Sequence, residues 1–128
     1  MNSRHVFQFG CMELMDDYAV ITCNEGVHID LNEIEAIEVV LDTAYSNKRF
    51  GFIANRVSSY SVDPLAVRKL FSRDNLAAGA VVGGSKHIKH IAKLEFEIIG
   101  GPPKKHFKDM SSAVKWIECL VREDCEDI

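Results

Sequence analysis

The residues of this sequence that are best suited to chemistry form a polar segment near its middle, NRVSSYSVDP, at positions 55–64. Serines and a tyrosine lie between Asn55 and Pro64. Such hydroxyls can act as nucleophiles, carry a phosphate or contact a partner. A serine nucleophile needs a base, and spacing alone places no histidine or acid beside these serines. The same residue types are also typical of a turn, because their hydroxyls bond nearby backbone groups.

An apolar strand and a helix are predicted to position this segment. The run RFGFIANRV at 49–57 is typical of a buried strand, and Asp63 can cap a helix that begins at Pro64. Open α/β sheets bind ligands beyond the carboxyl ends of their strands, so we expect the segment to lie at such an end. The candidate partner or ligand contacts are Asn55, Arg56, Ser58, Ser59, Tyr60, Ser61 and Asp63.

A glycine-rich run, GAVVGGSK at 79–86, is compared with the phosphate loop GxxxxGK[ST]. The glycine spacing matches, but the serine precedes the lysine, so the lysine is displaced by one position. A nucleotide loop is therefore not expected, and no cofactor is predicted. An anion could still bind the free N–H groups where a helix begins, or the run could be a tight turn with a serine cap. The candidate anion-site residues are Gly83, Gly84, Ser85 and Lys86.

Basic residues crowd the helix predicted after this run: Lys86, His87, Lys89, His90 and Lys93. The two histidines are three apart and can share one helix face. Their cationic neighbours oppose a bound cation, so no metal site is predicted. The face suits an acidic partner, an anionic lipid surface or plain solvent.

Composition and charge exclude several classes of protein. The formal net charge of −4 argues against a general nucleic-acid binder. No apolar run approaches the roughly 20 residues that span a bilayer, and MNSRHVFQF has no apolar signal core. The four cysteines, Cys11, Cys23, Cys119 and Cys125, show no CxxC spacing. We therefore expect a cytoplasmic protein with reduced thiols and no integral membrane segment.

The first half of the chain reads as strands followed by a helix. HVFQFG and YAVITC are predicted strands, with Met12–Asp17 as their connection, and a short strand is expected in GVHID. Asp30 is a good N-cap, and Glu33 completes a capping box for a helix through Ala44.

The second half alternates strand and helix. AAGAVVGG and KKHFK are predicted strands, the second at an edge of the sheet. Ser85 and Asp109 are predicted to cap the two remaining helices. The first of these helices should face inward through Ile88, Ile91, Leu94 and Ile98. We expect one α/β domain over 1–128, with a mixed, mostly parallel sheet of about five strands, about four helices and a frayed tail from about 124 to 128.

This order of elements, together with IDLNEIEAI, NRVSSYSVDP and HFKDMSSAVKWI, resembles the SpoIIAA-like group, meaning STAS domains and their STAS/SEC14-like relatives. The segment at 55–64 is most similar to that of small stand-alone bacterial members. In the anti-sigma-factor antagonists of this fold, a phosphorylatable serine begins the helix after the third main strand. Here Asn55 and Asp63 match the two aspartates of that motif, and Pro64 stands at the serine position. Because proline has no hydroxyl, the resemblance implies no phosphoserine switch at Pro64.

The resemblance implies a non-catalytic interaction or regulatory module rather than an enzyme. It would bind a protein partner or itself through the 55–64 loop and the following helix. The alternative is a small-molecule or lipid-like ligand-binding protein of SEC14-like character. A hydrolase built on the serine loop is the least favoured hypothesis, because no triad or metal set is visible. A phosphate on Ser58, Ser59 or Ser61, received by Arg56, is a side hypothesis.

Overall fold

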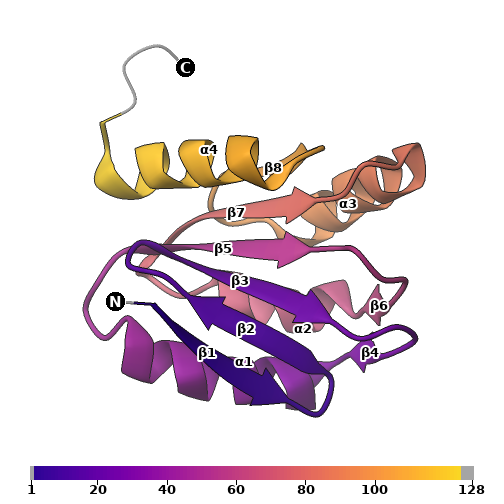
Figure 1. The fold of residues 1–128 in the computed structure, drawn as a ribbon, viewed down its shortest axis with the longest axis horizontal. Helices are drawn as coiled ribbons and strands as arrows, with labels where there is room; N and C mark the ends of the chain where they lie inside the picture. Colours follow the sequence, from indigo (N-terminus) through magenta and orange to yellow (C-terminus); the bar gives the residue numbers. More distant parts are fainter. Residues whose placement is uncertain (1, 125–128) are drawn as a thin grey trace.

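The computed structural model describes residues 2–124 and shows a central β-sheet with helices on both faces (Figure 1). The sheet has six strands in the order β1-β2-β3-β5-β7-β8. The first three strands form an antiparallel meander, and β3, β5, β7 and β8 run parallel. The strand bounds are β1 Ser3–Phe7, β2 Gly10–Leu14, β3 Tyr18–Cys23, β5 Phe50–Asn55, β7 Leu76–Val82 and β8 Lys104–Phe107. This confirms the predicted mixed α/β class.

The four helices divide unequally between the two faces of the sheet (Figure 1). On one face, three helices share a core with Met12, Ile21 and Phe52. On the other face, a single helix packs on Val20, Ile53 and Ala80. The three helices are α1 Leu31–Ala44, α2 Pro64–Phe71 and α3 Lys86–Ile99, and the single helix is α4 Met110–Arg122.

Each helix begins at the residue that the sequence predicts. The carboxylate of Asp30 accepts the N–H of Leu31 at 2.8 Å, and Glu33 accepts the N–H of Asp30 at 2.8 Å. Asp63, Ser85 and Asp109 cap α2, α3 and α4 through their side chains. Such caps are local, since they satisfy N–H groups one to three residues away.

The predicted connection at Met12–Asp17 is wrong in its first half, because β2 extends through Leu14. Met12 and Leu14 are buried while Glu13 is exposed, which is the alternation of a strand with one covered face. The turn that the prediction missed lies earlier, at residues 8–9, and closes a hairpin between β1 and β2. The sheet therefore has six strands rather than about five.

The sequence predicts only one strand of a second, two-stranded sheet. The short strand expected in GVHID exists as β4, His28–Ile29, and it pairs in parallel with β6, Ser61–Val62. β6 lies inside the segment that the sequence marks as a loop. We call β4 and β6 the short sheet.

The predicted inner face of α3 is also wrong in part. Leu94 and Ile98 are 51% and 42% exposed, while Ala92 and Ile99 are buried. The helix is rotated so that Ala92, which has a small side chain, allows a close approach. The same rotation turns Glu95 inward, toward the strand that carries the polar segment.

Glycines in the central strands make room for the helices on both faces. A Cβ added to Gly51 would lie 2.3 Å from Ile117 of α4, and one added to Gly79 would lie 2.3 Å from Phe71 of α2. Both contacts are shorter than packed carbon atoms tolerate. The two glycines therefore set how closely α4 and α2 approach the sheet.

Two further expectations can be compared with the structure. Cys11 and Cys23 are free thiols as expected, whereas Cys119 is disulfide-bonded, which the sequence did not predict. The predicted frayed tail lies outside the described residues apart from Asp124. Among residues 2–124, no helix combines the length and the apolar character needed to cross a bilayer.

Candidate functional site

The polar segment joins β5 to α2 at the carboxyl ends of the parallel strands, where the short sheet also lies (Figure 1). We call residues 55–63 the site loop. The loop is fixed at its start, because the N–H of Arg56 donates to the carbonyl of Val82 in β7 at 2.9 Å. It is fixed at its end by Asp63, whose carboxylate accepts the N–H of Leu65 at 3.0 Å.

Arg56 holds the site loop from beneath. Its side chain is 8% exposed, and its Nη1 donates to Oε1 of Glu95 in α3 at 3.0 Å. Its Nη2 donates to the carbonyl of Tyr60 at 3.1 Å, and its guanidinium carbon lies 4.7 Å from the centre of the Tyr60 ring. A guanidinium satisfied in this way is committed to the fold. These bonds direct the Arg56 side chain toward Glu95 and the inside of the loop.

Burial shifts the pKa values of three groups around Arg56. Burial raises the pKa of Glu95, and the adjacent guanidinium opposes that rise. Burial also raises the pKa of the Cys23 thiol to about 11, against the effect of its hydrogen bond with Tyr60. Burial raises the pKa of Tyr60 as well. Cys23 is therefore a neutral thiol at pH 7 and is poorly suited to act as a nucleophile.

The outer part of the site loop is bonded to the chain around β4. The N–H of Gly26 donates to the carbonyl of Ser59 at 2.7 Å, and the N–H of Ser61 donates to the carbonyl of Val27 at 3.1 Å. The N–H of Ser59 donates to the Glu25 carboxylate at 3.0 Å. Backbone bonds in both directions leave the loop little freedom to move.

A histidine lies beside one of the candidate serines. Nδ1 of His28 and Oγ of Ser61 are 2.7 Å apart, and the two residues are register partners in the short sheet. They are 33 residues apart in the chain, so spacing could not reveal the pair. A signal was nevertheless present, because HIDL at 28–31 and SVDP at 61–64 share one pattern of strand, aspartate cap and helix. Two such units side by side align His28 with Ser61.

Apolar side chains flank the loop on its outer surface. Val57 is 70% exposed and Leu65, in the first turn of α2, is 62% exposed. Ser59 and Ser61 are exposed beside them, whereas Asn55, Ser58, Tyr60 and Asp63 are half-buried. The surface of the loop therefore offers hydroxyls and aliphatic groups on a fixed backbone.

Beneath the loop is a small apolar cavity of about 70 Å³, between the sheet and the helices α1, α2 and α3. The wall nearest the loop is formed by Cys23, Ala54, Arg56, Tyr60, Glu95 and Phe96. Pockets that take a drug-sized ligand are roughly 300–1,000 Å³. The cavity in this conformation is large enough for only a few non-hydrogen atoms.

The candidate anion site at the start of α3 is only partly available. The N–H of Gly83 donates to the carbonyl of Phe107 at 3.0 Å, and Oγ of Ser85 accepts the N–H of Ile88 at 3.1 Å. A Cβ at Gly83 would lie 2.8 Å from Ile88, so packing explains this glycine. Gly84 and Lys86 are exposed. These contacts match the tight turn with a serine cap. Within the described residues, no group of His, Cys, Asp or Glu side chains is placed to hold a metal.

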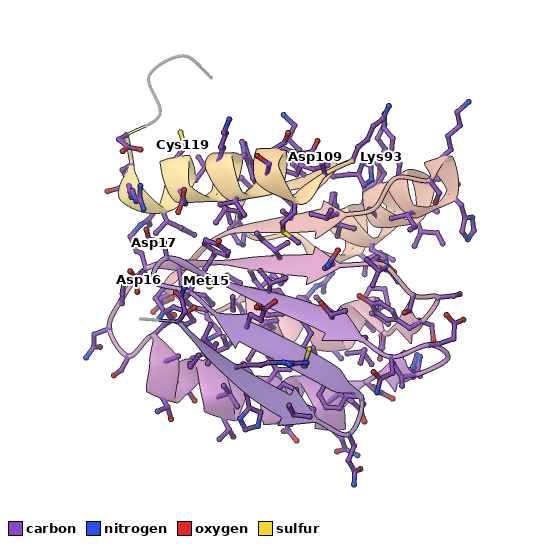
Figure 2. The ribbon with its side chains drawn as sticks, viewed as in Figure 1. Met15, Asp16, Asp17, Lys93, Asp109 and Cys119 are labelled. Carbon is purple, nitrogen blue, oxygen red and sulfur yellow. The ribbon has the colours of Figure 1, made fainter. Side chains whose placement is uncertain are left out.

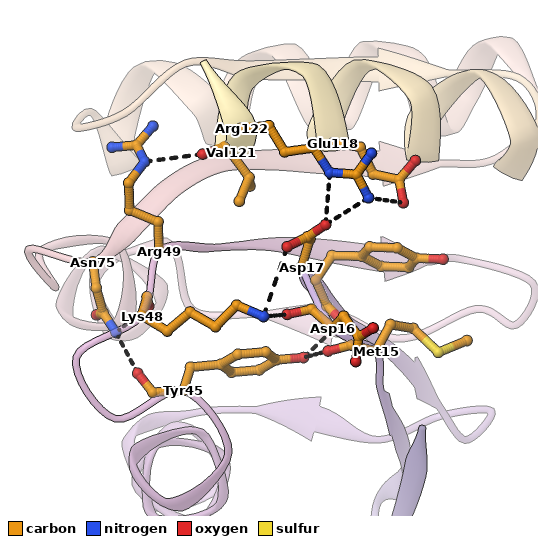
Figure 3. A network of polar contacts seen from close by, with 11 residues as sticks. Met15, Asp16, Asp17, Tyr45, Lys48, Arg49, Asn75, Glu118, Val121 and Arg122 are labelled. Atoms are coloured by element: carbon orange, nitrogen blue, oxygen red, sulfur yellow. Dashed lines mark hydrogen bonds and ion pairs between the residues drawn. The ribbon is translucent and has the colours of Figure 1, made fainter. Parts of the chain in front are cut away.

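A second polar network lies at the amino ends of the parallel strands (Figure 3). The Asp17 carboxylate accepts Nε of Arg122 at 2.9 Å and lies 3.7 Å from Nζ of Lys48. The Tyr45 hydroxyl lies 2.7 Å from the carbonyls of Met15 and Tyr18. This amino-end network joins α1, the β2–β3 turn and α4. Figure 2 shows Met15, Asp16 and Asp17 on the side of the molecule away from Lys93 of α3.

Comparison with known proteins shows a likeness of fold. No protein-family model and no curated protein sequence matches the chain. An uncharacterized DUF3478-family protein from Shewanella loihica PV-4, described as having a SpoIIAA-like fold, superposes with a TM-score of 0.58 at 12% identity. The match covers 91% of this chain and 92% of that chain. The chain therefore has a SpoIIAA-like fold, as its sequence predicts.

Proposed function

We propose that this chain is a non-catalytic interaction module of the STAS-like type. It binds a protein partner, or a second copy of itself, through residues 55–64 and the start of α2. The observation that carries the proposal is a rigid loop with exposed aliphatic ends, Val57 and Leu65, supported from below by Arg56. A preorganised surface loses little entropy when a partner binds.

The proposal includes no phosphate switch at the helix start. Pro64 is the first residue of α2, and its side chain has no hydroxyl that could carry a phosphate. A phosphate on Ser58, Ser59 or Ser61 remains a separate prediction. Ser61 is the best placed of the three, because it is exposed and His28 adjoins it. Phosphopeptide mapping that finds all three serines unmodified in cells would remove this prediction.

The non-catalytic part of the proposal is supported by the surroundings of Ser61. Its neighbour His28 is exposed, and within residues 2–124 no carboxylate bonds the other imidazole nitrogen. A serine nucleophile normally has a base that a third group orients, in a site that excludes water. A serine-reactive probe that labelled Ser61 would contradict this part of the proposal.

The interaction part is tested by placing glutamates on the site-loop surface and, as a control, on a surface elsewhere. The double variant Val57→Glu with Leu65→Glu places carboxylates on the site-loop surface, and Val39→Glu is the control. Val39 is 68% exposed on α1, nearly the same as the 70% of Val57. The wild type, the double variant and the control variant are each used as bait in extract from the source organism, and the captured proteins are compared. We expect captured partners to be kept by the control and lost by the double variant. Identical partner sets for both variants would overturn the proposal.

A second candidate function is supported by the cavity under the site loop. Its apolar walls suit a small apolar ligand, and a larger ligand would require the lining side chains to move. Native mass spectrometry of the freshly purified protein, before and after incubation with a lipid extract, tests this function. An added ligand mass would support it, and a bare mass in both samples would count against it.

A further inference from the structure

The two edges of the six-stranded sheet are protected to different degrees. β8 is short, carries Lys104 and Lys105, follows two prolines and is contacted by α3 and α4. Short length, lysines, prolines and covering helices are the usual means of keeping sheet edges apart. β1, with the sequence SRHVF, has no lysine, proline or acidic residue, and residues 3–6 are exposed. Its pairing with β2 runs through all five residues without a bulge.

The hydrogen bonds of the meander show which backbone groups of β1 are unpaired within residues 2–124. The N–H of Met15 donates to the carbonyl of Tyr18, and the N–H of Asn24 donates to the carbonyl of Phe9. Together with the registers of the strand pairs, these bonds assign residues 11 and 13 to pairing with β3 and residues 10, 12 and 14 to pairing with β1. The groups of Ser3, His5 and Phe7 are therefore used within the hairpin. Those of Arg4 and Val6 point away from the sheet.

We propose that β1 is a homodimer interface, at which two copies of the chain pair their β1 strands antiparallel about a two-fold axis through His5. Arg4 of one copy then lies opposite Val6 of the other, and the symmetry repeats the pair. Each Arg4–Val6 pair exchanges two main-chain hydrogen bonds, because both residues direct their backbone groups outward. The edge of β1 can therefore pair with the same edge of a second copy, as an isologous contact requires.

The side chains beside the edge fit this pairing. Arg4 is the register partner of Glu13 in β2, so a row across the interface reads Glu13, Arg4, then Val6 and Cys11 of the second copy. The two arginines are not opposite each other, and each has a carboxylate beside it. Val6, which is 70% exposed in one copy, gains an aliphatic contact with the stem of Arg4.

The other face of the strand carries an aromatic row. The rings of His5 and Phe7 are 4.6 Å apart, and those of Phe7 and Phe9 are stacked at 4.7 Å. Antiparallel pairing about His5 joins this row to its symmetry copy. Aromatic cross-strand contacts are among the more stabilising pairs in sheets.

This dimer uses a different surface from the proposed partner site. β1 runs parallel to β3 and β5, because it is separated from β3 by one antiparallel strand. In the dimer the second copy's strands run the opposite way. The two site loops therefore lie at opposite ends of a continuous sheet, and both remain free for partners. A single strand edge buries less than the roughly 1,200 Å² of a standard interface, so we expect a weak dimer.

Analytical ultracentrifugation over roughly 10–500 μM tests the proposal at the concentrations where a weak dimer forms. We expect the full chain to shift from monomer to dimer across this range. Val6→Pro removes an outward N–H and leaves the bonds to β2 intact, so it should abolish the shift. Val6→Thr keeps the N–H and should retain it. A wild-type protein that stays monomeric throughout, or a Val6→Pro variant that still dimerises, would overturn the proposal.

A covalent test does not depend on the folding of the proline variant. Two residues at the axis of a non-hydrogen-bonded pair have Cα atoms roughly 4.5 Å apart, within disulfide range. His5→Cys should therefore give an intermolecular disulfide dimer under mild oxidation. Ser3→Cys is on the same face of the same strand, but its copies would be roughly 13 Å apart, too far to bridge. Equal cross-linking of the two variants, or none for His5→Cys, would contradict the proposed register.

Discussion

The two ends of the parallel strands both carry polar networks, but the networks differ in what surrounds their charges. At the carboxyl end, the Arg56–Glu95 pair has side chains that are 8% and 15% exposed. At the amino end, Arg122 and Lys48 are 52% and 48% exposed, and they share Asp17, which at 15% is as enclosed as Glu95. One network is enclosed and supports an exposed loop, whereas the other is open to water and ties elements from both faces of the sheet. The same kinds of residue should therefore contribute very differently to stability.

The largest expected effect comes from removing the acid that pairs with the buried Arg56. Glu95→Ala leaves Arg56 enclosed without its carboxylate, which costs about 3 kcal/mol in the free energy of unfolding. Glu95→Gln keeps an oxygen that can accept from Nη1 and should cost much less. Urea unfolding of the three proteins checks this. Equal losses for the two variants would show that the hydrogen bond at Arg56 does not matter.

A smaller loss is expected from the Tyr45 hydroxyl at the amino end. Tyr45→Phe leaves the carbonyls of Met15 and Tyr18 without this contact, at a cost of about 1–2 kcal/mol. The ring stays in place against Phe50, with which it stacks at 4.5 Å. A loss as large as that of Glu95→Ala would contradict the view that the amino-end network is the weaker of the two.

The exposed ion pairs of the amino-end network should contribute least. Asp17→Asn keeps the side-chain shape and removes the charge that Arg122 and Lys48 share. Because both cations are half exposed, we expect a loss of about 1 kcal/mol or less, which shrinks further in high salt. Thermal unfolding at low and high ionic strength measures both quantities. A loss independent of salt would count against the comparison.

The pH dependence of the unfolding free energy tests how strongly Glu95 is enclosed. The pKa of Glu95 is raised above its ordinary value of 4.5 by burial, so the folded chain binds a proton there more readily than the unfolded chain. This group therefore adds stability below its ordinary pKa, and that contribution is lost as the pH rises through the raised value. Glu95→Gln should remove this contribution from a profile of unfolding free energy against pH. Profiles of identical shape for wild type and variant would contradict the raised pKa.

Whether the sequence could predict an interaction depends on how far apart its residues are in the chain. The caps Asp30, Asp63, Ser85 and Asp109 were all predicted, because a cap bonds backbone groups within three residues. The Arg56–Glu95 pair joins residues 39 apart and depends on the rotation of α3, which periodicity placed incorrectly. The sequence marked Arg56 only as a candidate contact for a partner or ligand. A polar type in a loop does not show which way it faces.

The strand that was missed illustrates a different limit. Met12 and Leu14 alternate with outward residues, but the run is short and holds a glycine, a methionine and a glutamate rather than β-branched residues. Pairing with β1 and β3 overrides this weak local preference. Because β2 lies between β1 and β3, recognising β2 also identifies β1 as an edge strand of the sheet.

Amide hydrogen exchange in the site loop tests the central claim most directly, namely that a buried ion pair keeps this loop rigid. In the wild type we expect the N–H groups of Arg56, Ser61 and Asp63 to be protected, because each donates to a backbone carbonyl. Glu95→Ala should remove this protection while Ile53 in β5 stays protected, and Glu95→Gln should keep most of it. Rapid exchange at Ser61 and Asp63 in the wild type would contradict the account.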